Sequence, residues 1–195
     1  MNSYMRRIHP LIAVAAAALL SCAGCAPQRR ESTGHLNAKD IYKIILQQKF
    51  PQDAKLVVHP LSVIDAHHFP SSARWEKRTR RLLTEKFPEL KKGALDAFFR
   101  NNRRTRSIGA AALADPHILV RECRPDGSFH TFGLQYPDAL CLISFSQPAF
   151  SADGTQAVVY CVRSAGPEKA EGRYYFLTHA DEVWQITGGI LSWAY

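Results

Sequence analysis

The spacing of apolar residues divides the chain into a helical first half and a β-strand second half. Helical periodicity predicts helices over residues 37–50, 72–86 and 88–100, the first capped by the side chain of Asn37 and ended by Pro51. Between residues 103 and 115 no clear period is present beyond a helical turn at 110–113. The first half therefore predicts two or three helices.

Extended segments follow a different pattern. The β-branched segment 55–69 predicts a strand, and Pro60 inside it favours an edge position or a bulge. From Ile118 onward, period-two alternation predicts further strands at residues 118–123, 128–134, 140–150, 155–163, 172–179 and 183–193. The first two of these flank Pro-Asp-Gly, a turn signal that predicts a hairpin. We therefore expect a single α+β domain over residues 38–195, with two or three N-terminal helices packed on an antiparallel β-meander.

The N-terminus has the features of an export signal. Arg6 and Arg7 precede an unbroken apolar run of ten residues, 11–20, which is too short to span a bilayer. The following residues, Leu19 to Cys22, resemble the lipobox of bacterial lipoproteins, where signal peptidase II cuts before a cysteine that carries diacylglycerol. This resemblance implies a signal peptide over residues 1–21, and the polar segment 22–37 is expected to be a flexible tether.

Two cysteines compete for the lipid attachment. Cys22 fits the motif better, because Leu19 and Ser21 occupy the positions three and one before it, and Cys25 is the alternative. Plain secretion by signal peptidase I, with a cut after Ala26, is a further alternative, since Gly24-Cys25-Ala26 also ends in small residues. Neither cysteine is followed by the Asp that retains enterobacterial lipoproteins in the inner membrane. We therefore expect a cell-envelope protein with an N-terminal lipid anchor, at the outer membrane or facing the periplasm.

Charge is distributed unevenly. The chain is 46% hydrophobic and 22% charged, which excludes intrinsic disorder, and its formal net charge is +8. Residues 73–106 hold twelve Lys and Arg against four acids, whereas residues 107–195 hold five against nine. Behind an export signal, the available polyanions are envelope surfaces and not nucleic acid. The candidate anionic-surface contacts are Arg74, Arg78, Arg81, Arg103 and Arg104. The alternative is a solvated helix face without a partner.

Signals for catalysis are sparse. On a strand, Asp65 and His67 would share one face, but His59 would lie about 20 Å from Asp65. Because a zinc site needs three or four ligands, we expect no metal and no cofactor. Gly-x-Ser-x-Gly is absent, and residues 187–189 (Thr-Gly-Gly) indicate a bulge more simply than a phosphate loop.

Three cysteines fall inside the domain. The expected turn at residues 151–154 places Cys161 opposite Ser144, which leaves Cys141 about 10 Å out of register. A bridge between Cys141 and Cys161 is therefore not expected, because bridged Cα atoms lie within about 7 Å. A disulfide from Cys123 to either one stays open, as does the alternative that all three are small buried hydrophobic residues.

A set of residues in the second half resembles a group of uncharacterised bacterial exported proteins and lipoproteins that end in a β-meander. The resemblance covers roughly residues 85–195 and rests on Ala97 to Asn102, Tyr136-Pro137, Ser146, Phe150, Asp153, Thr155, Ala157, Val159, Tyr160, Gly172, Tyr174, Tyr175, Leu177, Trp184, Ile186 and Trp193. The chain departs from the group at residues 164–168, where many members have a Cys- and Gly-rich loop. The resemblance implies a β-meander and carries no established activity.

These observations favour a lipid-anchored envelope protein whose domain is a binding or interaction module. The alternative is an envelope hydrolase with a site near Asp65 and His67, and a third hypothesis is a structural envelope component whose basic helices dock on an anionic surface. Enzymatic activity is the less favoured hypothesis.

Overall fold

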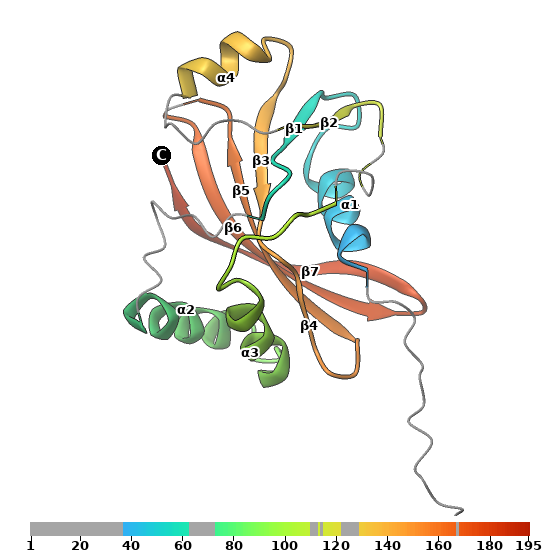
Figure 1. Ribbon diagram of the computed structural model, residues 1–195. Helices are drawn as coiled ribbons and strands as arrows, with labels where there is room; N and C mark the ends of the chain where they lie inside the picture. The colour runs from blue at the N-terminus through green and yellow to red at the C-terminus, as the bar shows by residue number, and fades with distance from the viewer. Residues whose placement is uncertain (1–36, 63–72, 110–112, 114, 122–128, 167) are drawn as a thin grey trace, which may run out of the picture. The chain divides into compact units, whose positions relative to one another are not determined.

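The computed structural model describes residues 37–62, 73–109, 113, 115–121, 129–166 and 168–195, and shows an α+β fold (Figure 1). The described helices are α1 (Ala38–Lys49), α2 (Ala73–Lys86), α3 (Lys92–Asn101) and α4 (Phe129–Gln135). The strands are β1 (Leu56–Val58), β2 (Ile118–Val120), β3 (Cys141–Phe145), β4 (Ala149–Phe150), β5 (Gln156–Ser164), β6 (Ala170–Ala180) and β7 (Val183–Ala194). In the described part of the chain, no helix is long and apolar enough to cross a membrane.

All seven strands belong to one sheet in the order β2-β1-β3-β5-β6-β7, and β4 pairs with β5 beside this path. Strands β3, β5, β6 and β7 are antiparallel, which confirms the predicted C-terminal meander. The first strand differs from the expectation, because β1 lies between β2 and β3 and runs parallel to both. The sheet is therefore mostly, not wholly, antiparallel.

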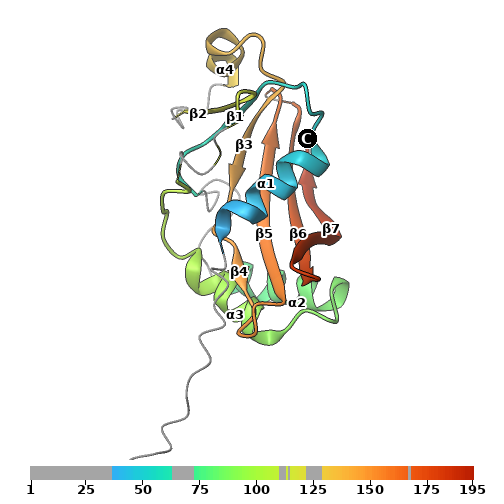
Figure 2. The same ribbon diagram turned by 90° about the vertical axis from the view of Figure 1, so that its right-hand side faces the viewer.

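Helices cover both faces of the sheet, because alternate residues of each strand point to opposite sides. Helix α1 buries Ile41, Tyr42 and Ile45 against a core that includes Val159 and Leu177 (Figure 2). The opposite face carries a second core in which side chains of α2 and α3 meet strand residues, including Leu83, Phe98, Phe99, Val158, Tyr174 and Phe176. The domain is a three-layer arrangement of helix, sheet and helices.

The predicted hairpin over residues 118–134 is wrong. Strand β2 pairs in parallel with β1, and the second half of the expected hairpin is helix α4. Within α4, Phe132 is buried and its ring centroid lies 5.8 Å from that of Tyr136, a contact at the i, i+4 spacing of a helix. Because Phe132 and Tyr136 are also an even number of residues apart, the pattern was equally compatible with a strand.

Two predicted strands are shorter than expected. Within the described part of the segment 55–69, residues 56–58 alone form a strand; residues 63–69 lie outside the described residues. The segment 140–150 is divided into β3 and β4, because Ser146 leaves the regular pairing: its hydroxyl accepts the backbone N–H of Tyr160 at 2.8 Å. Consequently Phe145, not Ser144, lies opposite Cys161.

Candidate functional site

Several sequence candidates fall outside the described residues. These are the lipidation candidates Cys22 and Cys25, the pair Asp65 and His67, and Cys123. They remain predictions from the sequence. The described domain therefore contributes two other candidate features, a basic helical surface and a pocket beside α1.

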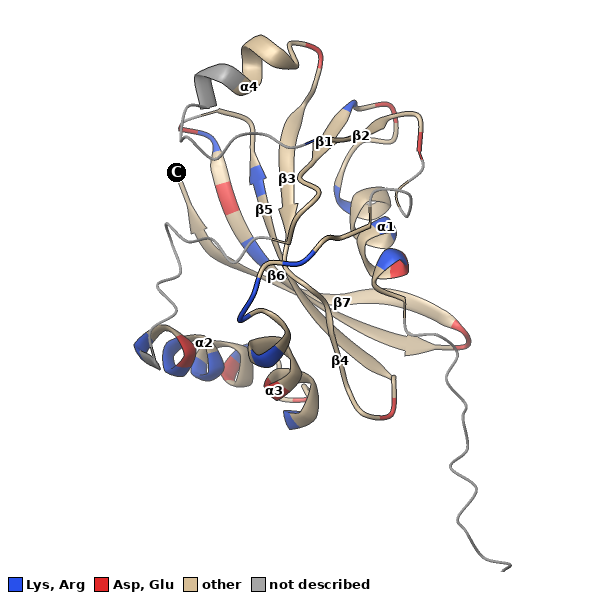
Figure 3. Cartoon of the chain, in the orientation of Figure 1, with Lys and Arg blue, Asp and Glu red and all other residues tan. Residues whose placement is uncertain are grey.

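The basic surface consists of Arg74, Arg78 and Arg81 on α2, and Arg103 and Arg104 after the end of α3, and all five residues are exposed. The three α2 arginines are spaced by four and three residues, so they follow one side of the helix. Figure 3 shows that Lys and Arg positions recur along α2. The sequence analysis named these five residues as candidate contacts with an anionic surface, and that assignment stays a prediction. All five side chains are accessible to an anionic surface.

Arg80, in contrast, turns toward the protein. Its guanidinium donates to Glu76 at 2.8 and 2.9 Å and to Asp96 at 2.6 Å, and it stacks over the Phe99 ring at 4.4 Å. Of the neighbouring acids, Glu76 and Asp96 are thus engaged by Arg80, and Glu85 lies 3.1 Å from Arg81. These three acids therefore pair with Arg80 and Arg81, whereas the side chains of Arg74 and Arg78 are exposed to solvent.

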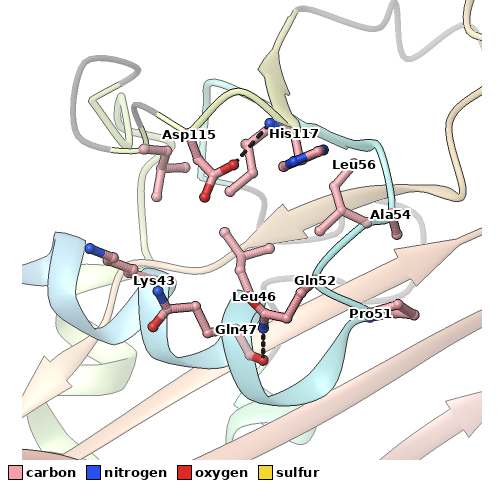
Figure 4. Close-up of a pocket in the computed structure, with 11 residues that line it drawn as sticks. Lys43, Leu46, Gln47, Pro51, Gln52, Ala54, Leu56, Asp115 and His117 are labelled. Carbon is pink, nitrogen blue, oxygen red and sulfur yellow. Dashed lines mark hydrogen bonds between the residues drawn. The ribbon is translucent and has the colours of Figure 1, made fainter.

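A pocket of about 230 Å³ lies between α1, the following loop, and the segment leading into β2 (Figure 4). Its floor is apolar and is formed by Leu46, Leu56, Ala54, Leu113 and Ile118. Its rim is polar and is formed by Lys43, Gln47, Gln52, Asp115 and His117. The lining is thus mixed, with polar and apolar side chains in similar measure. Small-molecule sites use apolar surface for burial and a few polar groups to fix the ligand's orientation.

Local hydrogen bonds order this rim. Oδ1 of Asp115 accepts the backbone N–H of His117 at 2.9 Å, which forms a tight turn before β2. Nε2 of Gln52 donates to the carbonyl of Gln47 and fastens the loop to the end of α1. The Lys43 ammonium and the Asp115 carboxylate thus provide one charge of each sign at the mouth. Sequence reasoning missed this pocket; its only signal was Asp-Pro-His in a segment without clear periodicity.

Residues that carry the resemblance to exported bacterial proteins include two with structural roles. Asn102 is buried; its Nδ2 donates to the carbonyls of Phe98 and Gln147, both at 2.9 Å, and its Oδ1 accepts the N–H of Gln147 at 2.7 Å. The carbonyl of Ser146 accepts the Tyr42 hydroxyl at 3.1 Å, so α1 and α3 both hold the β3–β4 connection. These motif residues stabilise the fold and do not form the pocket.

The remaining candidates have simple structural explanations. Cys141 and Cys161 are free, buried thiols, and burial raises the pKa of each. The Thr-Gly-Gly segment is a bulge in β7, as the sequence indicated, because the pairing with β6 skips Thr187. Gly188 is also required by packing, since a Cβ there would lie 2.5 Å from Cε1 of Phe87.

The described residues contain no group of three or more His, Cys, Asp or Glu side chains that could hold a metal ion. Comparison with known proteins gives no relative: no family model, curated protein or solved structure matches the chain. The proposals below therefore rest on this chain's own residues.

Proposed function

We propose that the chain is a lipid-anchored envelope protein whose α+β domain binds a small ligand in the pocket beside α1. The lipobox at residues 19–22 supports the anchor, and the tether at 22–37 would join the anchor to the domain. The observation that carries the binding function is the pocket itself, an apolar floor beneath a rim with charges of both signs.

The lining suggests the class of ligand. Lys43 can donate to a carboxylate, Asp115 can accept from an ammonium, and the floor around Leu46 and Leu56 can bury an apolar group. A cavity of about 230 Å³ accommodates a small molecule and not a polymer. We infer a small zwitterionic ligand with an apolar part.

Native mass spectrometry of the full chain, purified in nonionic detergent from its own envelope, tests this proposal. We expect a bound small molecule that is lost in the variant Lys43→Ala. The matched control is Lys39→Ala, because Lys39 is exposed on the same helix one turn earlier and does not line the pocket. A wild-type mass without added ligand, or equal ligand in both variants, would contradict the assignment.

A second function is favoured by the basic surface, namely docking of the domain on anionic phospholipid headgroups. Each well-placed Lys or Arg near such a surface contributes about 1 kcal/mol, so Arg74 and Arg78 together contribute about 2 kcal/mol, and Arg81 contributes less because Glu85 pairs with it. The lipid anchor would keep the domain close to the headgroups and make this weak attraction effective.

Sedimentation with vesicles tests the docking. The reversal Arg74→Glu, Arg78→Glu and Arg81→Glu should abolish binding to vesicles with anionic lipid. The equally charged control, Lys39→Glu, Arg121→Glu and Lys169→Glu, changes exposed residues outside the basic surface and should bind far better. Binding must also fall with rising salt; equal loss in the two triple variants, or no salt dependence, would sink the idea.

A further inference from the structure

Strand β7 forms one edge of the sheet and has unusual composition for that position. It is twelve residues long, lies last in the strand order, and pairs with β6 (Figure 2). From Val183 to Tyr195 the chain contains no charged residue and no proline. Edge strands are normally kept from pairing with other chains by charges, proline or short length. Val183 and Leu191 are moreover about half exposed, at 54% and 46%.

Strand β2, at the opposite edge of the sheet, has two of these protective features. Strand β2 has three residues and is followed by the exposed Arg121. In β7 the only feature that hinders pairing with another strand is a pair of bulges, at Thr187 and Ser192. Between the bulges, Gly188 to Leu191 pair with β6 in regular register. This stretch of β7 is therefore a regular edge with neutral side chains.

A groove of about 500 Å³ lies beside this same stretch, on the face of the sheet that α1 covers. Its floor includes Gly189, which pairs with the buried Tyr175. A Cβ built on Gly189 would lie 3.5 Å from Cδ1 of Tyr175, an ordinary contact, so neither sterics nor a positive φ requires glycine there. The missing side chain leaves the groove open at the sheet edge.

The polar lining of the groove favours an acidic group. Lys49 and Arg173 supply two positive charges, and Glu171 supplies one negative charge. The guanidinium of Arg173 lies 3.5 Å from Glu171, outside ideal hydrogen-bond distance, and its side chain is 36% exposed. The Arg173 guanidinium can therefore still donate a charge-assisted hydrogen bond to a carboxylate of a bound partner.

We propose that the edge of β7 receives an extended segment of an acidic partner protein as an added strand, with an acidic side chain of that segment in the groove. Main-chain hydrogen bonds supply affinity in this mode of recognition, and a side-chain pocket beside the edge supplies specificity. A second copy of the chain fits less well, because residues 183–195 offer no acid to the groove. The two cations of the groove, Lys49 and Arg173, outnumber its one acid, Glu171, and this local balance favours an acidic partner.

Fluorescence anisotropy with model peptides tests the proposal on the full chain in nonionic detergent. The probe is a labelled peptide, Thr-Val-Glu-Val-Glu-Val-Thr, whose alternation places both acids on one face of a strand. We expect it to bind about tenfold more tightly than the same peptide with Lys for Glu. N-methylation of the central backbone amides should remove binding of the acidic peptide, because the added strand loses its hydrogen bonds.

Two variants locate the interaction. Gly189→Leu adds a side chain to the groove, and its Cβ would make only ordinary contacts. The variant should weaken binding of the acidic peptide about tenfold while leaving thermal stability near that of the wild type. Arg173→Gln should remove the preference for Glu over Lys but keep the sensitivity to N-methylation. The matched control is Lys169→Gln, an exposed cation outside the groove.

Three results would overturn the proposal. They are equal affinity for the acidic and basic peptides, binding that survives N-methylation, and a stable dimer of the full chain that Gly189→Leu dissociates. The dimer would assign the edge to a second copy of the chain.

Discussion

Removal of the Asn102 side chain provides a quantitative check on how the helical layer is joined to the sheet. Asn102 is 5% exposed, and its amide makes three hydrogen bonds, of which two bind the backbone of Gln147. Each contributes about 1 kcal/mol net, and a backbone group left unpaired in a partly buried site costs about 1–3 kcal/mol. We therefore expect Asn102→Ala to lower the free energy of unfolding by about 2–4 kcal/mol.

Urea unfolding followed by circular dichroism measures this loss as a shift of the midpoint at unchanged slope. The matched control is Asn101→Ala, because Asn101 makes one longer bond, at 3.2 Å, to the carbonyl of Pro148, and its loss should cost about 1 kcal/mol or less. Hydrogen exchange at the amide of Gln147 should accelerate only in Asn102→Ala. Equal midpoints for the two variants would refute the inference that Asn102 is the main tie between α3 and the β3–β4 connection.

Three further predictions follow from the described contacts. Gly188→Ala should lower the free energy of unfolding by about 1–3 kcal/mol, because the added Cβ would overlap the Phe87 ring. Gly189→Ala should change it by less than about 0.5 kcal/mol, and thermal unfolding of the two variants compares these effects directly. Hydrogen bonds from Lys91, Ser151 and Thr155 hold the pKa of Asp153 below its ordinary value, so ionised Asp153 stabilises the fold above pH 4 and this contribution is lost as pH falls through the lowered pKa. Asp153→Asn should therefore be less stable than the wild type at pH 7, and a difference that does not shrink in acid would contradict this assignment. Burial raises the pKa of the Cys161 and Cys141 thiols, so iodoacetamide should modify neither in the native state and both in urea, as peptide mass spectrometry would show.

Strong local signals made the helices and the C-terminal meander predictable. Asn37 caps α1 through its Oδ1, which accepts the N–H of Lys39 at 3.1 Å, as its position before a periodic segment indicated. Strands β5 and β6 bury side chains on both faces, whereas β7 alternates between exposed and partly buried positions. Helices α2 and α3 also lie close to the ranges expected from periodicity, 72–86 and 88–100.

Non-local pairing explains the failures. The parallel contacts of β1 depend on β2 and β3, which lie far along the chain, and no local pattern encodes such partners. The pocket beside α1 has the same origin, because Lys43 and Asp115 are separated by more than 70 residues and meet only through the fold. Helix α4 was missed for a different reason, since the contact of Phe132 with Tyr136 has a spacing that a strand also allows.

The central position of β1 has a consequence for how the chain acquires its structure. Leu56 pairs with Ile118 and Cys141, about 60 and 85 residues later, so β1 has no neighbour until the second half of the chain is present. Contacts of this separation close large loops and slow folding. A nascent chain therefore cannot complete the pairing of β1 until residues 118–145 have been synthesised. The topology thus makes completion of the sheet a late event in the folding of the chain.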